Sequence, residues 1–313
     1  MSRYIAGVEL GGTSCVAAIA EISNPTTIVH HFEVSTTEYT STLGALTEYL
    51  SAQLKEFNIE SYAALGIASF GPVDLKPDSK TYGYITSTPK PGWKYVEIVG
   101  VFKRTLKEGT PIAFDTDVNA PALAEMAAAL NTKTIPIPLP TVIYITVGTG
   151  VGVGVTVEGS PVHGLLHPEG GHIIVPRMQG DEYPGCCAYG HECCVEGMVD
   201  SQAIAERVNV HRHELHTIDD NNPVWKVVGY YLGALCLNIT YLLSPNLIIL
   251  GGGIMKRRIL YTETRHWFKE LLKEYLDSPQ FKTDQGLASY IKEPFHGSKA
   301  GIVGALELAR HKC

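Results

Sequence analysis

The sequence predicts an α/β fold built from two related halves. The stretch "YIAGVELGGTSCVAAIAE" (residues 4–21) has two short apolar runs joined by a glycine–threonine turn, the pattern of a hairpin. "TVIYITVGTGVGVGVTVEG" (residues 141–159) repeats it in kind, and the proline-rich "TIPIPLP" (134–140) between the halves predicts an irregular connector. We infer an ancient duplication in which each half presents one glycine turn.

Apolar periodicity places the elements of the first half. We predict, in order, strands at 3–9, 15–22 and 26–34, a helix at 42–57, buried strands at 63–69 and 110–114, and an alanine-rich helix over "NAPALAEMAAAL" (119–130). This order supports an α/β half that contains both a hairpin and buried strands.

The second half continues from its hairpin into a loop region. We predict a loop at 159–194, helices near 195–209 and 224–243, a buried strand at 246–253, an amphipathic helix near 256–276 and a closing helix from about Ser298. The closing helix carries alanine and glycine at close spacing, which indicates tight helix packing.

Composition and charge exclude several function classes. The chain has 313 residues, of which 45% are hydrophobic and 18% charged, with a net charge of −7. This acidic balance disfavours a nucleic-acid partner and an anionic membrane surface. The first residues lack a secretory signal, and we expect no apolar run of membrane-spanning length. The sequence therefore predicts a cytoplasmic protein with no membrane partner.

Two glycine–threonine turns are candidate phosphate sites. A glycine turn leaves backbone N–H groups free to point at an anion, and the threonine hydroxyl can donate one more hydrogen bond. Gly11-Gly12-Thr13 and Gly148-Thr149-Gly150 both fit. Either turn alone is weak evidence, but two at matching places in duplicated halves favour a nucleotide site.

A third glycine cluster, Gly251-Gly252-Gly253, ends the predicted strand at 246–253 and opens a helix. It fits a ligand site at a strand end and, equally well, a plain strand-to-helix turn. The chain has neither the G-x-G-x-x-G dinucleotide pattern with its acidic partner nor a G-x-x-x-x-G-K-[ST] loop. Nucleotide binding would thus use a different architecture.

Asp115 and Asp117 lie two residues apart at a predicted strand end. Alternation along an extended chain would send both carboxylates to one side. Asp117 could cap the following helix, which is the common role for such a residue. It could also be the carboxylate that takes the proton of an attacking hydroxyl in phosphoryl transfer.

"GCCAYGHECC" (185–194) holds four of the seven cysteines and a histidine. In a reducing compartment such a cluster is more often a metal site than a disulfide. A free-thiol cluster and a redox pair are the alternatives, and the absence of C-x-x-C favours zinc.

Taken in order, these motifs resemble the ROK family of sugar kinases. The resemblance rests on "GVELGGTS", "ASFGPVD", "TYGYITSTPKPGW", "DTDVNAPALAE", "ITVGTGVGVG", "HPEGGH", the Cys/His cluster before "VEGMVDS", "SPNLIILGGGI" and "HGSKAGIVGALELA". "TSTPKPGW" and the glutamate before the first Gly-Gly are similar to the bacterial-type fructokinase branch.

This resemblance implies two ribonuclease-H-like, actin-like ATPase domains with a cleft between them. We expect a small domain at 1–118 with the closing helix at 298–313, and a large domain with the zinc loop at 119–297. The implied reaction is transfer of the γ-phosphoryl group of ATP, with Mg²⁺, to the 6-hydroxyl of a hexose, preferably D-fructose. A homodimer is also implied.

The family's site residues carry over position by position. The catalytic aspartate falls on Asp117, and sugar contacts fall on Asn119, Glu169, His172 and Glu196. The resemblance places ATP contacts at Gly11, Gly12, Thr13, Thr149, Pro223, Gly251, Gly252 and Gly253. Many members have lysine after the first Gly-Gly-Thr, whereas Ser14 here carries no charge, so Mg²⁺ would have to neutralise more of the phosphate charge.

The resemblance also implies a structural zinc site formed by His172, Cys187, His191 and Cys194. The loop reads C-x3-H-x2-C, one residue longer than the fructokinase-type C-x2-H-x2-C, and Cys186 and Cys193 are adjacent competitors. Such a site would tie the "EGGH" segment to the "VEG" helix start and hold Glu169 and Glu196 toward the sugar.

Three alternatives stay open. The substrate could be another hexose such as mannose or glucose. The family also includes sugar-sensing transcriptional regulators, but the first strand begins by Arg3, which leaves no room for a preceding helix-turn-helix. A zinc-stabilised interaction module without activity is disfavoured by Asp117 and the two turns.

Overall fold

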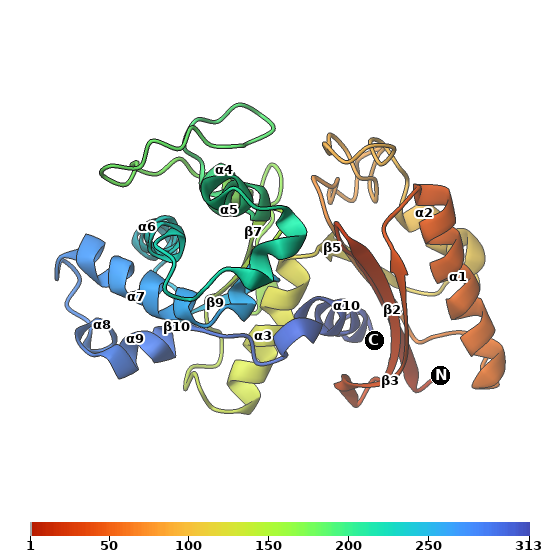
Figure 1. The fold of residues 1–313 in the computed structure, drawn as a ribbon. Coiled ribbons are helices and arrows are strands. Elements are labelled where there is room, and N and C mark those ends of the chain that lie inside the picture. The colour runs from red at the N-terminus through yellow and green to blue at the C-terminus, as the bar shows by residue number, and fades with distance from the viewer. Residues whose placement is uncertain (1) are drawn as a thin grey trace. The chain divides into compact units, whose positions relative to one another are not determined.

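The computed structural model describes residues 2–313, which form two compact units (Figure 1). Unit 1 contains the chain up to Thr134, Gly154–Pro168 and Lys299–Cys313, and unit 2 contains Ile135–Val153 and Glu169–Ser298. The chain forms two five-stranded sheets with helices packed on them. The predicted α/β class is confirmed.

The sheet of unit 1 has the strand order β3-β2-β1-β4-β5. Its strands are β1 (Tyr4–Leu10), β2 (Ser14–Glu21), β3 (Asn24–Ser35), β4 (Leu65–Ser69) and β5 (Ile112–Thr116). β1, β2 and β3 pair antiparallel, and β4 and β5 continue the sheet in parallel. The carboxyl ends of β1, β4 and β5 therefore lie along one edge, next to the first glycine turn.

Helices cover both faces of this sheet (Figure 1). They are α1 (Tyr39–Glu56), α2 (Val99–Thr105), α3 (Asn119–Asn131) and α10 (Ala300–Arg310). α10 approaches β4 so closely that a Cβ on Gly66 would lie 1.9 Å from the Ala305 carbonyl oxygen. The tight packing predicted for the closing helix is confirmed. α2 was not predicted from the sequence.

The second sheet has the order β10-β9-β6-β7-β8. Its strands are β6 (Val142–Val147), β7 (Val151–Val157), β8 (Ser160–Pro161), β9 (Leu247–Gly251) and β10 (Ile291–Lys292). β6 pairs in parallel with β9, so their carboxyl ends meet at one edge. The second glycine turn joins β6 to β7, as predicted.

The helices of unit 2 differ from the prediction. They are α4 (Val195–Val199), α5 (Ser201–Val208), α6 (Val224–Leu243), α7 (Ile259–Leu272), α8 (Pro279–Lys282) and α9 (Asp284–Tyr290). The prediction did not include α8 and α9. The single helix predicted near 195–209 is broken at Asp200, whose side chain accepts a hydrogen bond from Ala203 N–H and caps α5. α7 begins later than predicted because Ile254–Lys256 forms a 3₁₀ turn.

The predicted domain boundary at residue 118 differs from the division into units. α3 packs with unit 1, where a Cβ on Gly304 of α10 would lie 2.4 Å from the Ala120 carbonyl carbon. Residues 154–168 also join unit 1, and a Cβ on Gly154 would lie 1.9 Å from Val118 O. These contacts join segments that are far apart in the sequence, so the order of the elements along the chain could not predict this division.

The sequence was expected to hold no apolar run of membrane-spanning length, but helix α6 is such a run. Within residues 2–313 it is the single helix long and apolar enough to cross a membrane by length and composition. However, 67% of its most apolar window is buried inside the protein. That burial is typical of a core helix.

Candidate active site and metal centre

Asp115 and Asp117, at the carboxyl end of β5, have different surroundings. Asp115 is 2% exposed, and its carboxylate accepts hydrogen bonds from Thr116 N–H (2.7 Å), Asn119 Nδ2 (2.9 Å) and His163 Nε2 (2.8 Å). The hydrogen bond to Asp115 raises the pKa of His163. Asp117 follows the last residue of the strand and is only half-buried. Asp115 therefore has a structural role, whereas Asp117 stays accessible for chemistry.

The structure does not support a capping role for Asp117. α3 begins at Asn119 with Val118 at the N-cap, and the Asn119 N–H donates to Thr116 Oγ1 at 3.0 Å. The Asp117 N–H instead bonds to the Ser69 carbonyl at the end of β4, at 2.9 Å. This bond holds the backbone of Asp117 against the neighbouring strand.

Asn119 was predicted to contact the substrate, but its side chain is fully buried. Its Oδ1 accepts the Val155 N–H at 3.1 Å, and its Nδ2 donates to Asp115. Because these bonds occupy the amide inside unit 1, the structure gives Asn119 a positioning role at the base of the β5–α3 corner.

Glu9 is a site residue that was recognised in the sequence only as part of a motif. It lies on β1 before the first Gly-Gly, close enough to Asp117 for their charges to interact. Burial, together with the charges of Asp117 and Glu33, raises its pKa to about 7, and a hydrogen bond from Ile302 N–H opposes the shift. A charged residue in an otherwise apolar strand was the signal that could have identified it.

We predict that Glu9→Gln changes how stability depends on pH. The folded-state pKa of about 7 lies above the ordinary 4.5, so the folded protein binds the extra proton between these values. The contribution of Glu9 to the free energy of unfolding therefore falls as pH rises from 4.5 to 7. Glu9→Gln should remove that loss, so the variant gains on the wild type by up to about 3 kcal/mol toward neutral pH.

Urea unfolding of both proteins from pH 5 to pH 8 measures this difference. Glu48→Gln, at an exposed position on α1, is the matched control and should leave the pH dependence unchanged. If the difference in free energy of unfolding between wild type and Glu9→Gln stayed constant from pH 5 to pH 8, the prediction would be wrong.

The first glycine turn is an open anion cradle at the edge of unit 1. The Gly11 N–H closes the turn on Ser14 O at 3.1 Å, and Gly12 and Thr13 are exposed. A Cβ on Gly12 would meet nothing within 4 Å, so the space above it is open. Among residues 2–313 the N–H groups of Gly12 and Thr13 have no hydrogen-bond partner, which suits them to an anion.

The second glycine turn is hydrogen-bonded to the side chain of Glu196 on α4. Glu196 Oε2 accepts the Val151 N–H at 2.9 Å, and a Cβ on Gly150 would lie 2.6 Å from that oxygen. Gly148 O accepts the N–H of Ser201, the first residue of α5. Thr149 at the tip of the turn remains exposed.

The third glycine cluster lies beside the second turn. Gly252 has φ +91°, and a Cβ there would lie 2.3 Å from Val147 O at the end of β6. Gly148 is also close, since its Cβ would be 4.0 Å from Gly253 N. Two glycine segments thus meet at the carboxyl ends of the parallel strands β6 and β9, where α/β sheets bind ligands.

Pro223 lies at the N-cap of α6 and lines an open cavity of about 410 Å³ in unit 2. The cavity is lined by Asp181, Tyr183, Arg207, Val208, Asn222, Pro223, Val224 and Val227. The expected ATP contact of Pro223 therefore falls on a pocket wall with both polar and apolar groups.

The structure brings His172, Cys187, His191 and Cys194 together as one cluster. Their ligand atoms all lie within 4.8 Å of one another, with Cys187 Sγ 3.5 Å from His191 Nδ1 and 3.9 Å from His172 Nδ1. This is the predicted set, and all seven cysteines are free thiols. The disulfide alternative is excluded in the structure.

The two competing cysteines have other neighbours. Cys186 Sγ donates to Asp200 Oδ1 at 3.3 Å, and Cys193 contacts the side chain of Tyr231. The side chains of Cys186 and Cys187 therefore point to different surroundings, Cys186 toward Asp200 and Cys187 into the Cys/His cluster. This arrangement selects Cys187 and Cys194 as the ligand candidates.

The four residues fit zinc. Two thiolates and two imidazoles are a common donor set for a closed structural site, and Zn–S and Zn–N bonds of about 2.3 and 2.0 Å require ligand atoms a little under 4 Å apart. Burial raises the pKa of Cys194, with a smaller opposing effect from the Gly197 N–H. Metal binding would have to displace that thiol proton.

His172 connects this cluster to two carboxylates. Its Nδ1 faces Cys187, while its Nε2 lies 3.8 Å from Glu196 Oε1. Glu169 precedes the 3₁₀ turn Gly170–His172, and burial, with the charge of Glu196, raises its pKa. Three of the predicted sugar contacts are thus brought together beside the metal cluster. Glu196 also links the cluster to the second glycine turn.

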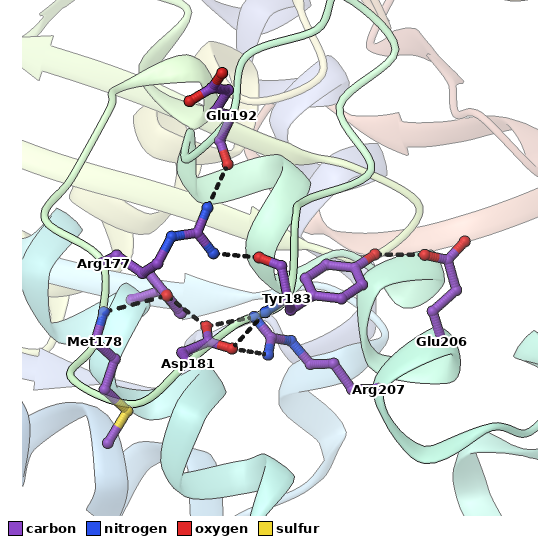
Figure 2. Close-up of polar contacts among 8 residues, drawn as sticks. Arg177, Met178, Asp181, Tyr183, Glu192, Glu206 and Arg207 are labelled. Atoms are coloured by element: carbon purple, nitrogen blue, oxygen red, sulfur yellow. Dashed lines mark hydrogen bonds and ion pairs between the residues drawn. The ribbon is translucent and has the colours of Figure 1, made fainter.

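A polar network holds residues 177–192, in the loop that carries the Cys/His cluster (Figure 2). Asp181 forms two bonds with Arg207 of α5, at 2.6 and 2.9 Å, and accepts the Tyr231 hydroxyl of α6 at 2.5 Å. The Arg207 guanidinium stacks 4.3 Å from the Tyr183 ring centre. Arg177 closes the loop on itself by donating to the carbonyls of Tyr183 and Glu192.

This network is ionic at neutral pH. Burial opposes the charge on Asp181, but hydrogen bonds from Arg207 and Tyr231 outweigh it and lower the pKa to about 2. The side chains of Arg207 and Asp181 are 9% and 6% exposed. Removing one partner of such a buried pair is costly, so the loop is held on α5 and α6 by more than the metal cluster.

Comparison with known proteins identifies the family. The ROK family model matches residues 5–312. The chain belongs to the ROK family. A putative fructokinase of Bacillus subtilis (strain 168) is 37% identical over 309 residues, 97% of this chain and 95% of that protein. A fructokinase of Lactococcus lactis subsp. cremoris is 36% identical over 280 residues, 89% of each chain.

Solved ROK structures share the fold. A ROK glucokinase from Streptomyces griseus, in complex with glucose and AMPPNP, has a TM-score of 0.73 at 21% identity and covers 98% of this chain and 99% of its own. The predicted pair of ribonuclease-H-like domains is therefore confirmed at the level of the fold. The ROK assignment also agrees with the glycine turns found in each unit.

Proposed function

We propose that this ROK protein, a sugar kinase, transfers the γ-phosphoryl group of ATP to the 6-hydroxyl of D-fructose, with Asp117 as general base. The observation that carries the proposal is the half-buried Asp117 at the carboxyl end of β5, on the sheet edge that also presents the first glycine turn. The fructokinase names of relatives at 36–37% identity support the substrate class.

Glu9 leaves room for a charge on Asp117. Burial first, and then the charge of Asp117, raise the pKa of Glu9 to about 7, so Glu9 is largely neutral below that pH and places little negative charge beside Asp117. Asp117 then stays an anion that can accept the proton of the sugar hydroxyl as the oxygen attacks phosphorus. The buried bonds of Asp115 and Asn119 keep this corner in place.

The glycine turns would hold the nucleotide. In unit 1, the N–H groups of Gly12 and Thr13 are available to phosphate oxygens. In unit 2, Thr149 and the segment Gly251–Gly253 offer a second cradle, and Pro223, on the wall of the cavity of about 410 Å³, is a further candidate ATP contact. Mg²⁺ bound with ATP would supply charge neutralisation on the phosphates.

The sugar would be held in unit 2 by Glu169, His172 and Glu196. Carboxylate oxygens accept hydrogen bonds from hexose hydroxyls, and the structural zinc would fix the imidazole that lies between the two acids. Asn119 would act indirectly, through Asp115. We also expect a cytoplasmic homodimer.

ADP formation with a panel of hexoses tests this function. With ATP and Mg²⁺, we expect kcat/KM for D-fructose to exceed that for mannose and glucose by about 10-fold or more, because misplaced hydroxyls leave buried polar groups unpaired. 6-Deoxyfructose should give no phosphorylated product. Sugar binding without ADP formation would overturn the kinase proposal in favour of a sugar-sensing regulator. Preference for another hexose would overturn only the substrate.

A further inference from the structure

Lys90 of the "TSTPKPGW" segment lies at the first glycine turn. Its Nζ donates to the Gly12 carbonyl oxygen at 2.6 Å and lies 5.7 Å from the centre of the Phe70 ring. Lys90 and Gly12 are 78 residues apart in the sequence, so the tertiary fold brings this cation to the turn.

The loop that carries Lys90 is firmly anchored. Trp93 is fully buried, its Nε1 donates to Thr37 O at 2.9 Å, and its ring meets Phe70 edge-on at 5.2 Å. The Trp93 N–H bonds to the Lys90 carbonyl, and the Lys90 N–H bonds to Thr88 Oγ1. The backbone of Lys90 therefore has a defined position, and only its four-carbon stem is free to pivot.

The turn needs a positive charge to hold a triphosphate. Ser14, the residue after Thr13, is uncharged. The carboxyl groups of Glu9 and Asp117 at the same edge of the sheet do not attract phosphate either. The Lys90 ammonium has three donors and uses one of them on Gly12 O. Two donors remain for anionic oxygens beside the exposed N–H groups of the turn.

We propose that Lys90 is a phosphate-binding residue of this kinase, supplying at the first glycine turn the positive charge that position 14 lacks. On nucleotide binding, Lys90 Nζ donates a hydrogen bond to a phosphate oxygen of ATP, either in place of its bond to the Gly12 carbonyl oxygen or in addition to it. The inference rests on the proposed function, in which this turn holds the triphosphate. It adds a residue from a separate loop to the phosphate site.

Charge removal and charge transplantation test this inference. Lys90→Met should lower kcat/KM for ATP by about 10- to 100-fold, comparable to the loss of one preorganised donor at a reacting centre. Adding lysine at position 14 in the same chain, Ser14→Lys with Lys90→Met, should recover at least part of that loss. Lys94→Met, on the same loop with its Nζ over the Tyr95 ring, is the matched control and should match the wild type.

Lys90→Gln separates charge from hydrogen bonding. Glutamine keeps an N–H donor for the Gly12 carbonyl but carries no charge, so we expect it to lose as much as Lys90→Met. Thermal unfolding of each variant shows that it is folded. Full activity in Lys90→Gln, or a loss in Lys90→Met that Ser14→Lys leaves unrepaired, would overturn the inference.

Binding of Mg·ADP and of inorganic tripolyphosphate, measured by calorimetry, keeps this test independent of turnover. Both ligands should bind Lys90→Met about 10-fold more weakly than wild type, with a smaller salt dependence. If the wild type turned over no hexose, the proposed function would fail, yet these affinities would still decide the role of Lys90. Unchanged affinities for both ligands would overturn it, even in an active kinase.

Discussion

Asp117→Asn should lower kcat for fructose phosphorylation by roughly 10²- to 10⁴-fold, the usual contribution of a positioned general base. Asparagine has nearly the same shape but cannot accept a proton. Because the Asp117 backbone is held by its N–H bond to Ser69 O, the substitution should leave the β5–α3 corner in place. We therefore expect unchanged thermal unfolding and a fructose Kd within about 3-fold of wild type.

Steady-state kinetics with ATP and fructose, together with equilibrium sugar binding, check this prediction. Asp78→Asn, at an exposed position of unit 1, is the control and should retain wild-type kcat. Asp117→Asn that turns over within about 3-fold of wild type would contradict the assignment of Asp117 as the base.

Removing the metal should weaken sugar binding before it slows phosphoryl transfer. Cys187→Ser takes one thiolate from the four-residue cluster and should abolish stoichiometric zinc binding. Without the ion, His172 is no longer fixed against Glu196, so we expect KM for fructose to rise about 10- to 100-fold. Unfolding should also begin at lower temperature, while kcat at saturating sugar falls much less.

The adjacent cysteine gives a matched control for this experiment. Cys186→Ser lies one residue away, but its thiol faces Asp200 instead of the cluster, so this variant should keep one zinc ion per chain and a normal KM. Elemental analysis, thermal unfolding and kinetics are the measurements. Retention of zinc by Cys187→Ser, its loss from Cys186→Ser, or a chelated wild type with unchanged KM would each contradict the prediction.

Much of the fold could be predicted from local pattern. The runs Tyr4–Leu10 and Ser14–Glu21 are apolar and flank glycines, and both form the expected strands. Val142–Val147 and Val151–Val157 repeat this arrangement around the second turn. Such elements are predictable because strand alternation and turn chemistry act between neighbouring residues. α2 was missed because a seven-residue helix with one buried residue has little periodicity.

The candidate site was predictable only in part. The spacing of the Cys/His loop and its family resemblance pointed to His172, Cys187, His191 and Cys194, and the structure groups these four. The burial of Asn119 was not visible from the sequence, since its bonding partners include Val155, 36 residues away. The closeness of Glu9 to Asp117 was hidden for the same reason.

By itself, the sequence determined the α/β class, the two glycine turns and the chemical types gathered around them, because these depend on residue identity and short-range spacing. The tertiary structure alone decided that the Cys186 thiol faces Asp200, outside the Cys/His cluster, that α3 packs with unit 1, and that Lys90 reaches Gly12. Each of these outcomes depends on packing between segments far apart in the chain. Burial and the direction of a side chain are settled only when those segments meet.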